Sequence, residues 1–172
     1  MKIRTGGPGD VAATLTLLDK AIVWLTARGW PDQWGTEPRS TRPSSVAHIE
    51  EYARDHLLRA AELDGGVVGV CVLAEAPPEY VAEIAERELY IRLLITDRDR
   101  SGSGIGAALV ADACEEARRR GISLLRVDCY AGNGGGLVEQ YRRLGFEPAE
   151  PFTVTSPTTG EPWPGQVLQR RL

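Results

Sequence analysis

Three alternate glycines, at 102, 104 and 106, stand between a predicted strand and a predicted helix, and they most constrain what this chain can form. The strand, residues 88–96, is rich in β-branched and aromatic residues, and an apolar helix follows the glycines at once. Glycines lack a Cβ, so the backbone N–H groups of such a turn can approach a ligand closely. The helix adds the positive end of its dipole. The segment therefore predicts an anion site, and phosphate fits it best.

The remaining elements place this turn in a mixed sheet. The order β-α-α-β-β-β-α-β-α-β-β contains one βαβ unit, centred on the glycine loop, so one parallel strand pair is expected there. Asp64-Gly65-Gly66 predicts a hairpin in the middle of the chain. We expect an α/β fold in one domain, residues 1–172, with a mostly antiparallel sheet of about seven strands and helices on both faces. The predicted strands are 1–5, 58–63, 67–75, 88–96, 124–130, 152–155 and 166–171, and the helices are 10–28, 44–54, the segment from the glycine loop to Gly121, and 137–144.

The position of the glycine loop excludes two common phosphate motifs. A dinucleotide-binding loop follows the first strand of a parallel sheet, whereas this loop lies past the middle of the chain and after a hairpin. A Walker A loop needs Gly-Lys-Ser/Thr, and this chain has Gly106-Ala107-Ala108. Taken alone, the glycines also fit a tight strand-to-helix turn without a ligand.

Composition narrows the class of protein further. A net charge of −4 argues against nucleic acid and mildly favours a cationic small substrate. Cys71, Cys114 and Cys129 lie in apolar patterns and predict buried thiols. No apolar run has bilayer length and no signal peptide is evident, so we expect a cytoplasmic protein with no membrane partner. His48 and His56 have no ligand partners at metal-binding spacing, and we predict no metal.

Two downstream segments, together with the glycine loop, carry a family resemblance. They are Leu125-Arg126-Val127-Asp128-Cys129-Tyr130-Ala131-Gly132-Asn133 and Tyr141-Arg142-Arg143-Leu144-Gly145-Phe146. From about residue 90 to 146 the chain resembles the GCN5-related N-acetyltransferase (GNAT) superfamily, and residues 24–34 look like a sequence common in its small bacterial members. The resemblance implies transfer of acetyl from acetyl-CoA to a primary amine of a small molecule, by direct attack in a ternary complex. Protein N-termini or lysines remain alternative acceptors, and a monomer or homodimer is expected.

The resemblance also implies a cofactor site. In the family, amides of the glycine loop bind the pyrophosphate of acetyl-CoA, and the end of the preceding strand holds the pantetheine arm. The family loop usually begins with Arg or Gln where this chain has Ser101, so either Arg100 supplies the charge from a shifted position or the amides of the loop suffice. Asn133 aligns with an asparagine that contacts the cofactor arm, or it caps the next helix. The implied cofactor-binding residues are Leu94, Ile95, Thr96, Arg100, Ser101, Gly102, Ser103, Gly104, Ile105, Gly106, Ala107 and Asn133.

Catalytic residues follow from the same resemblance. Tyr141 aligns with the tyrosine that protonates the departing thiolate, although its helical spacing also fits a core aromatic. By alternation along the strand, Glu88, Tyr90, Arg92, Leu94 and Thr96 share one face.

On that face, Glu88 is the first candidate for the base that takes the amine proton, with Glu75 the second. A surface role or pairing with Arg92 is the simpler interpretation of Glu88. Trp30, Trp34 and Arg92 are expected at the acceptor side, where the two tryptophans could instead only pack the helices.

Two further hypotheses remain open. The departure at Ser101 and the unassigned base keep a non-catalytic acyl-CoA-binding protein possible. A nucleotide-binding regulatory module would use the glycine loop for another phosphate ligand.

Overall fold

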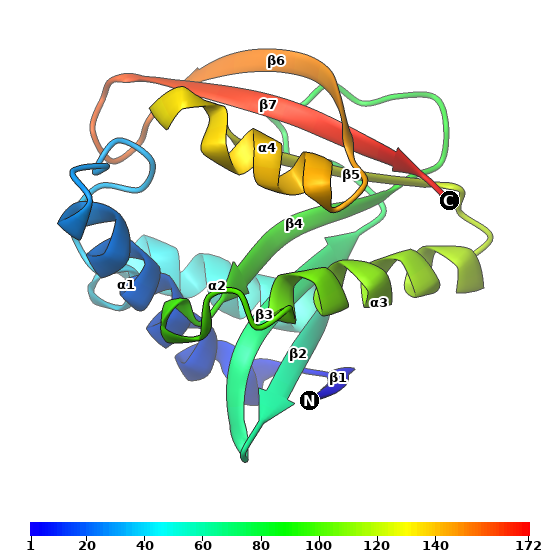
Figure 1. The fold of residues 1–172 in the computed structure, drawn as a ribbon, viewed down its shortest axis with the longest axis horizontal. Coiled ribbons are helices and arrows are strands. Elements are labelled where there is room, and N and C mark those ends of the chain that lie inside the picture. Colours follow the sequence, from blue (N-terminus) through cyan, green and yellow to red (C-terminus); the bar gives the residue numbers. More distant parts are fainter.

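Seven strands form one sheet in the order β1-β2-β3-β4-β5-β7-β6 (Figure 1). The computed structural model describes residues 1–172. The strands are β1 (Lys2–Thr5), β2 (Leu57–Leu63), β3 (Gly66–Ala74), β4 (Leu89–Thr96), β5 (Leu124–Tyr130), β6 (Glu147–Thr155) and β7 (Pro162–Arg171), and the helices are α1 (Val11–Ala27), α2 (Pro43–Asp55), α3 (Ile105–Arg119) and α4 (Gly136–Arg143). All neighbours pair antiparallel except β4 and β5, which are parallel. The predicted mixed sheet and its single parallel pair are confirmed.

Each face of the sheet has its own apolar core. α1 and α2 cover one face, where Leu18 and Ile49 pack against Val70 and Val72 of β3. α3 and α4 cover the other face, where Leu109 is fully buried against the sheet. Residues of β3 alternate between these two cores, as a strand buried on both faces requires. No helix is both long enough and apolar enough to cross a bilayer.

The last two strands are longer than their apolar pattern predicted. The expected strands covered 152–155 and 166–171, whereas β6 and β7 pair over Glu147–Thr155 and Pro162–Arg171. β6 lies at the sheet edge and most of its residues are exposed, so hydrophobic alternation does not mark it. Pro148 and Pro151 are tolerated because an edge strand leaves some backbone N–H groups unpaired. α2 begins at Pro43 rather than after a serine cap, since proline suits the first helical position.

β4 and β5 separate soon after they meet. Their parallel pairing runs only from Leu89 with Leu125 to Ile91 with Val127, and each strand continues beyond that point. β4 keeps its antiparallel pairing with β3 up to Thr96, so the gap opens on its β5 side. A V-shaped opening therefore begins just after Ile91 and Val127, which we call the apex.

A β-bulge in β4 changes which residues share a face. Val72 pairs with Leu93 and Leu73 with Ile91, which leaves Arg92 as the extra residue. Ile91 and Leu94 pack in the core under α3 and α4, and Leu93 packs in the core under α1 and α2. The prediction that Glu88, Tyr90, Arg92, Leu94 and Thr96 share one face is therefore wrong. Simple alternation fails after Arg92, because the extra residue of the bulge shifts each later side chain to the opposite face of the sheet.

Candidate active site

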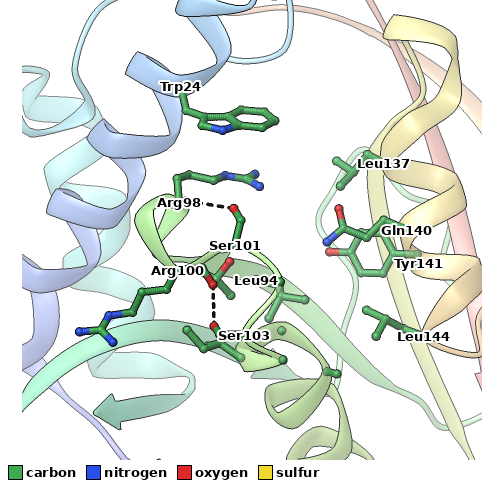
Figure 2. Close-up of a pocket in the computed structure, with 16 residues that line it drawn as sticks. Trp24, Leu94, Arg98, Arg100, Ser101, Ser103, Leu137, Gln140, Tyr141 and Leu144 are labelled. Carbon is green, nitrogen blue, oxygen red and sulfur yellow. Dashed lines mark hydrogen bonds between the residues drawn. The ribbon is translucent and has the colours of Figure 1, made fainter. Parts of the chain in front are cut away.

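A cleft of about 470 Å³ opens where β4 and β5 diverge, between the end of β4, the N-terminus of α3 and one face of α4 (Figure 2). The glycine loop forms one wall, and Leu137, Gln140, Tyr141 and Leu144 of α4 form the other. Residues implied as cofactor contacts by the sequence thus come together in one cavity. Those that line it are Leu94, Thr96, Arg100, Ser101, Gly102, Ser103, Gly104, Ile105, Gly106 and Ala107.

The glycine loop presents unsatisfied amides at the start of α3. Gly102 and Gly104 both have φ of +81°, a left-handed conformation that favours glycine, and Gly104 is the N-cap of α3. Ser103 donates its amide to the carbonyl of Arg100 at 3.2 Å. The amides of the other five residues implied as donors, Gly102, Gly104, Ile105, Gly106 and Ala107, have no acceptor in the protein. Five free N–H groups at a helix N-terminus make an anion site.

Side chains in and before the loop form hydrogen bonds and ion pairs that hold its backbone. Ser101 and Ser103 donate their hydroxyls to the carbonyls of Arg98 and Arg100 at 3.0 and 2.5 Å. The Arg100 guanidinium lies 3.5 Å from the exposed Asp64 carboxylate. Asp97 accepts the amide of Asp99 and the ammonium of Lys20 from α1, at 3.1 and 3.0 Å. These contacts fix the loop, so that its free amides are held in place before any ligand arrives.

Tyr141 faces the glycine loop across the cleft. Its ring packs edge-on against Phe146 at 5.6 Å, and its hydroxyl points toward Leu94 (Figure 2). That hydroxyl makes no hydrogen bond with the protein. Burial raises the pKa of Tyr141 well above its ordinary value, so the phenol keeps its proton at neutral pH. Tyr141 fits both roles considered for it, since it packs in the core as an aromatic residue and also lines the cleft.

The outer part of β4 has a free edge in the cleft. Leu94 and Thr96 line the cavity, and Ile95 points to the opposite core. β5 has diverged here, so this edge of β4 has no partner strand. A bound molecule could therefore hydrogen-bond to the strand as another strand would.

Arg98 is a residue of this cleft that sequence reasoning missed. Its guanidinium stacks on the ring of Trp24, 4.6 Å from the centroid, and extends over the cleft toward α4 (Figure 2). Its Nε is buried without a hydrogen-bond partner, and no carboxylate pairs with it. Nothing in the local pattern marks Arg98, because its partner Trp24 lies on α1, far away in the sequence.

Asp128 is a second missed residue, and it lies at the apex. It is the first residue of β5 beyond the last parallel pair. Tyr90 and Tyr80 donate their hydroxyls to its two carboxylate oxygens at 2.7 and 3.1 Å. Burial raises the pKa of Asp128 above its ordinary value. A carboxylate inside a strand whose neighbours Val127 and Cys129 are apolar is the sequence signal that could have identified it.

The two glutamates considered as bases have other partners. Glu88 is buried and accepts two hydrogen bonds of 3.1 Å from Arg126, whose second Nη also lies 3.2 Å from Glu150. The exposed Glu75 pairs with Arg87 and Arg120. Neither glutamate lines the cleft. Pairing of Glu88 was foreseen, but its partner is Arg126 on β5 and not Arg92.

Three further predicted residues, Asn133, Trp30 and Trp34, lie outside the cleft. Asn133 has φ of +54° and, with Trp30, lines a smaller cavity of about 240 Å³ beside the cleft. Asn133 does not cap α4, whose N-cap is Gly135, and the glycine run after it is kinked at Gly134. Trp34 packs against the core under α1 and α2, which is the packing role considered for it.

Comparisons with known proteins agree with this fold. The model of the acetyltransferase (GNAT) family matches residues 20–146, so the chain belongs to that family. An uncharacterised N-acetyltransferase of Methanocaldococcus jannaschii is 38% identical over 73 residues, which are 41% of this chain and 31% of that protein.

Solved structures share the fold over the full chain. A ribosomal-protein-alanine N-acetyltransferase of Brucella melitensis aligns with a TM-score of 0.69 at 23% identity, covering 100% of both chains. A putative acetyltransferase of Salmonella typhimurium, solved with acetyl-CoA, has a TM-score of 0.68 at 17% identity and covers 100% of this chain and 94% of its own.

Proposed function

We propose that this protein is an N-acetyltransferase that moves the acetyl group of acetyl-CoA to a primary amine of a small molecule in a ternary complex. One observation carries this proposal. The free amides of the glycine loop and the unpartnered hydroxyl of Tyr141 line the same cleft, at the place where β4 parts from β5. An anion site and a proton donor facing one cavity suit a substrate with both a pyrophosphate and a leaving thiolate.

The residues of the cleft fit acetyl-CoA. The five free amides would bind the pyrophosphate, and the free edge of β4 at Leu94–Thr96 would bind the amide groups of the pantetheine arm. Arg98 reaches over the cleft without a carboxylate partner, so it could supply the positive charge that Ser101 lacks. Arg100 lies beside it and is held only weakly by the exposed Asp64.

The chemistry needs proton transfer at the attacking nitrogen and at the departing sulfur. The acceptor ammonium first loses a proton, and its nitrogen then forms a bond to the thioester carbonyl carbon while the carbon–sulfur bond breaks. Tyr141 donates its proton to the departing sulfur and regains one from the second N–H of the attacking nitrogen through solvent. The net products are an N-acetyl amide, coenzyme A with a free thiol, and one proton.

Asp128 fits the role of the base better than Glu88. It lies at the apex, on the opposite side of the sheet from Tyr141, so an amine could approach the carbonyl from one side while the sulfur leaves on the other. Its raised pKa suits proton acceptance near neutral pH. Because the deprotonated form is the active one, kcat should fall as pH decreases through the pKa of Asp128. Glu88 remains the alternative, although Arg126 occupies its carboxylate.

Calorimetric titration with acetyl-CoA, NAD and ATP tests the cofactor, and a screen of amines with a free-thiol readout of coenzyme A release tests the reaction. We expect acetyl-CoA to bind and at least one amine class to release the thiol. Tight binding of ATP or NAD without acetyl-CoA would instead support a nucleotide-binding module. Acetyl-CoA binding without turnover of any amine would favour a binding protein. We also propose that the enzyme acts in the cytoplasm, without a metal, as a monomer or homodimer.

A further inference from the structure

We propose that the acceptor carries an anionic group close to its reactive amine, as an α-amino acid does, and that Arg92 binds this group while Asp128 faces the amine. This inference rests on the proposed function and names its class of acceptor. The observation behind it is a pair of opposite charges that flank the apex without neutralising each other.

Arg92 and Asp128 occupy equivalent places on the two diverging strands. Each is the first residue beyond the last parallel pair, Ile91 with Val127. Both side chains lie on the α1/α2 side of the sheet. The Arg92 guanidinium lies 5.8 Å from the ring centroid of Tyr52 on α2. Asp128 follows Val127, which packs in the core under α3 and α4, so the Asp128 side chain points to the opposite face. Paired strands are about 4.8 Å apart, and Arg92 and Asp128 stand just where β4 and β5 begin to separate. Two side chains that start this close together can both contact one small acceptor.

The two charges have no ionic partner. Arg92 donates one hydrogen bond of 3.3 Å, to the carbonyl of Ala76, and forms no ion pair. Asp128 accepts only the hydroxyls of Tyr80 and Tyr90. Some partly covered arginines pair with a carboxylate, such as Arg59 with Asp112 at 2.7 Å, whereas Arg92 and Arg98 do not. A half-buried guanidinium without a carboxylate is costly, and an anionic ligand group would relieve that cost.

Uncharged hydrogen-bonding side chains surround this pair. His48, Tyr52 and His56 stand four residues apart on α2, with the ring of Tyr52 4.2 Å from His48 and 5.4 Å from His56. Burial, and then the positive charge of Arg92, lower the pKa of both histidines, so they are neutral at pH 7. The acid of α2 nearest these rings is the exposed Glu51. Arg39, just before α2, also acts on His48, but Arg92 is the arginine that lies beside the last parallel pair.

Matched acceptors test the charge requirement. We would measure kcat/KM by free-thiol release for L-leucine, L-leucinamide and isoamylamine, and for the same three forms of methionine and phenylalanine. The acid should exceed its amide and its decarboxylated amine by about 10- to 100-fold for at least one side chain, which is the range for a lost hydrogen bond to a charged group. Equal or better rates with the amides and amines would overturn the inference.

Variants of Arg92 locate the effect. Arg92→Gln should lower kcat/KM for the preferred acid about 10- to 100-fold, leave its amide unchanged, and leave acetyl-CoA affinity unchanged, while Arg92→Lys should restore part of the loss. Arg54→Gln, an exposed arginine of α2 paired with Asp55, is the matched control and should change neither substrate. A loss of equal size for acid and amide would show that Arg92 is only structural.

Failure of this inference can be told apart from failure of the proposed function. Turnover of amides, simple amines or peptide N-termini, with no advantage for acids, leaves the N-acetyltransferase in place and removes the anionic acceptor. Without turnover of any acceptor, titration of the coenzyme A complex with L-leucine and L-leucinamide decides the ligand class separately. Tighter binding of the acid, lost in Arg92→Gln, supports it, and equal or absent binding rejects it.

Discussion

Two ionisable side chains flank the apex from opposite faces of the sheet, and burial shifts the pKa of both upward. For Tyr141 the shift secures the protonated phenol, which is the form that can donate a proton. For Asp128 the shift brings the pKa closer to neutral pH, which suits a general base. The same physical effect, desolvation, thus favours both proposed roles, the acid on one face and the base on the other. The structure supports these roles, and single substitutions test them.

Tyr141→Phe removes the phenolic proton and keeps the ring that packs on Phe146. We expect kcat to fall about 100-fold, within the range for a general acid, with the Kd for acetyl-CoA unchanged within about twofold. Steady-state kinetics and calorimetry measure the two quantities on the same preparation. An unchanged kcat would assign Tyr141 to packing alone.

Glu88→Gln and Asp128→Asn separate a structural carboxylate from a catalytic one. The side chains of Glu88 and Arg126 are 4% and 2% exposed, so loss of the Glu88 charge should lower the free energy of unfolding by about 3 kcal/mol. The kcat of the folded Glu88→Gln protein should be unchanged. If Glu88 were the base, kcat would fall even where the protein is fully folded.

Asp128→Asn should have the opposite effect, a loss of activity without a loss of stability. The pKa of Asp128 is higher in the folded protein than in the unfolded chain, so its contribution to stability increases as pH falls through that pKa. A neutral asparagine mimics the protonated form, and the melting temperature at pH 7 should not decrease. We expect kcat/KM to fall at least about 100-fold. A melting temperature several degrees below wild type would contradict this account.

Two irregular elements build the site, the glycine loop and the bulge in β4. The loop ends β4 and starts α3 within a few residues, and its left-handed glycines leave amides without acceptors. Arg92 stays on the α1/α2 face, and the bulge moves Leu94 and Thr96 to the opposite face, where they line the cleft. Regular versions of either element would lose part of the site, because an unbroken strand would place Arg92 and Leu94 on the same face.

Gly104→Ala tests the loop against a matched control at the other end of α3. Gly104 and Gly121 have φ of +81° and +68°, and a Cβ at either meets open space. Each alanine should therefore cost about 1–2 kcal/mol of stability through backbone strain. Gly104→Ala alone should also weaken acetyl-CoA binding, by about tenfold or more, because relaxation of the loop moves its amides. Similar affinities for both variants would remove the loop from the binding site.

At the scale of the whole molecule, two separate cores cover the two faces of the sheet in which the V opens. One packs α1 and α2 on the sheet, and the other packs α3 and α4. β4 stays joined to β3 and β5 to β7, with only three residue pairs between β4 and β5 themselves. A ligand that bridges the loop and α4 would therefore connect parts of the molecule that the sheet joins weakly.

Acetyl-CoA should accordingly stabilise the folded protein. At a free concentration of about 100 times its Kd, binding contributes about 2.7 kcal/mol, which corresponds to an increase of about 5 to 10 °C in melting temperature. Thermal unfolding monitored by circular dichroism measures this shift, with ATP at the same concentration as the control. A similar shift with ATP would mean that the loop binds phosphate without preference for coenzyme A.

Local sequence determined most of the elements and the glycine-loop side of the proposed site. Glycine placement, apolar periodicity and the hairpin turn predict the strands around β4, the start of α3 and the free amides, because these properties depend on residues close together in the chain. Only residues 152–155 of the edge strand β6 could be predicted this way, because the exposed first part of the strand carries no apolar alternation and is defined by its pairing with β7.

Only the tertiary structure decided the acceptor side. The bulge at Arg92 arises from pairing with β3, the partner of Glu88 comes from β5, and Arg98 rests on a tryptophan of α1. Asp128 gains its environment from Tyr80 and Tyr90, which are 48 and 38 residues away in the chain. Burial and partner choice depend on contacts between distant segments, so the sequence alone could name these residues but not the roles that their surroundings give them.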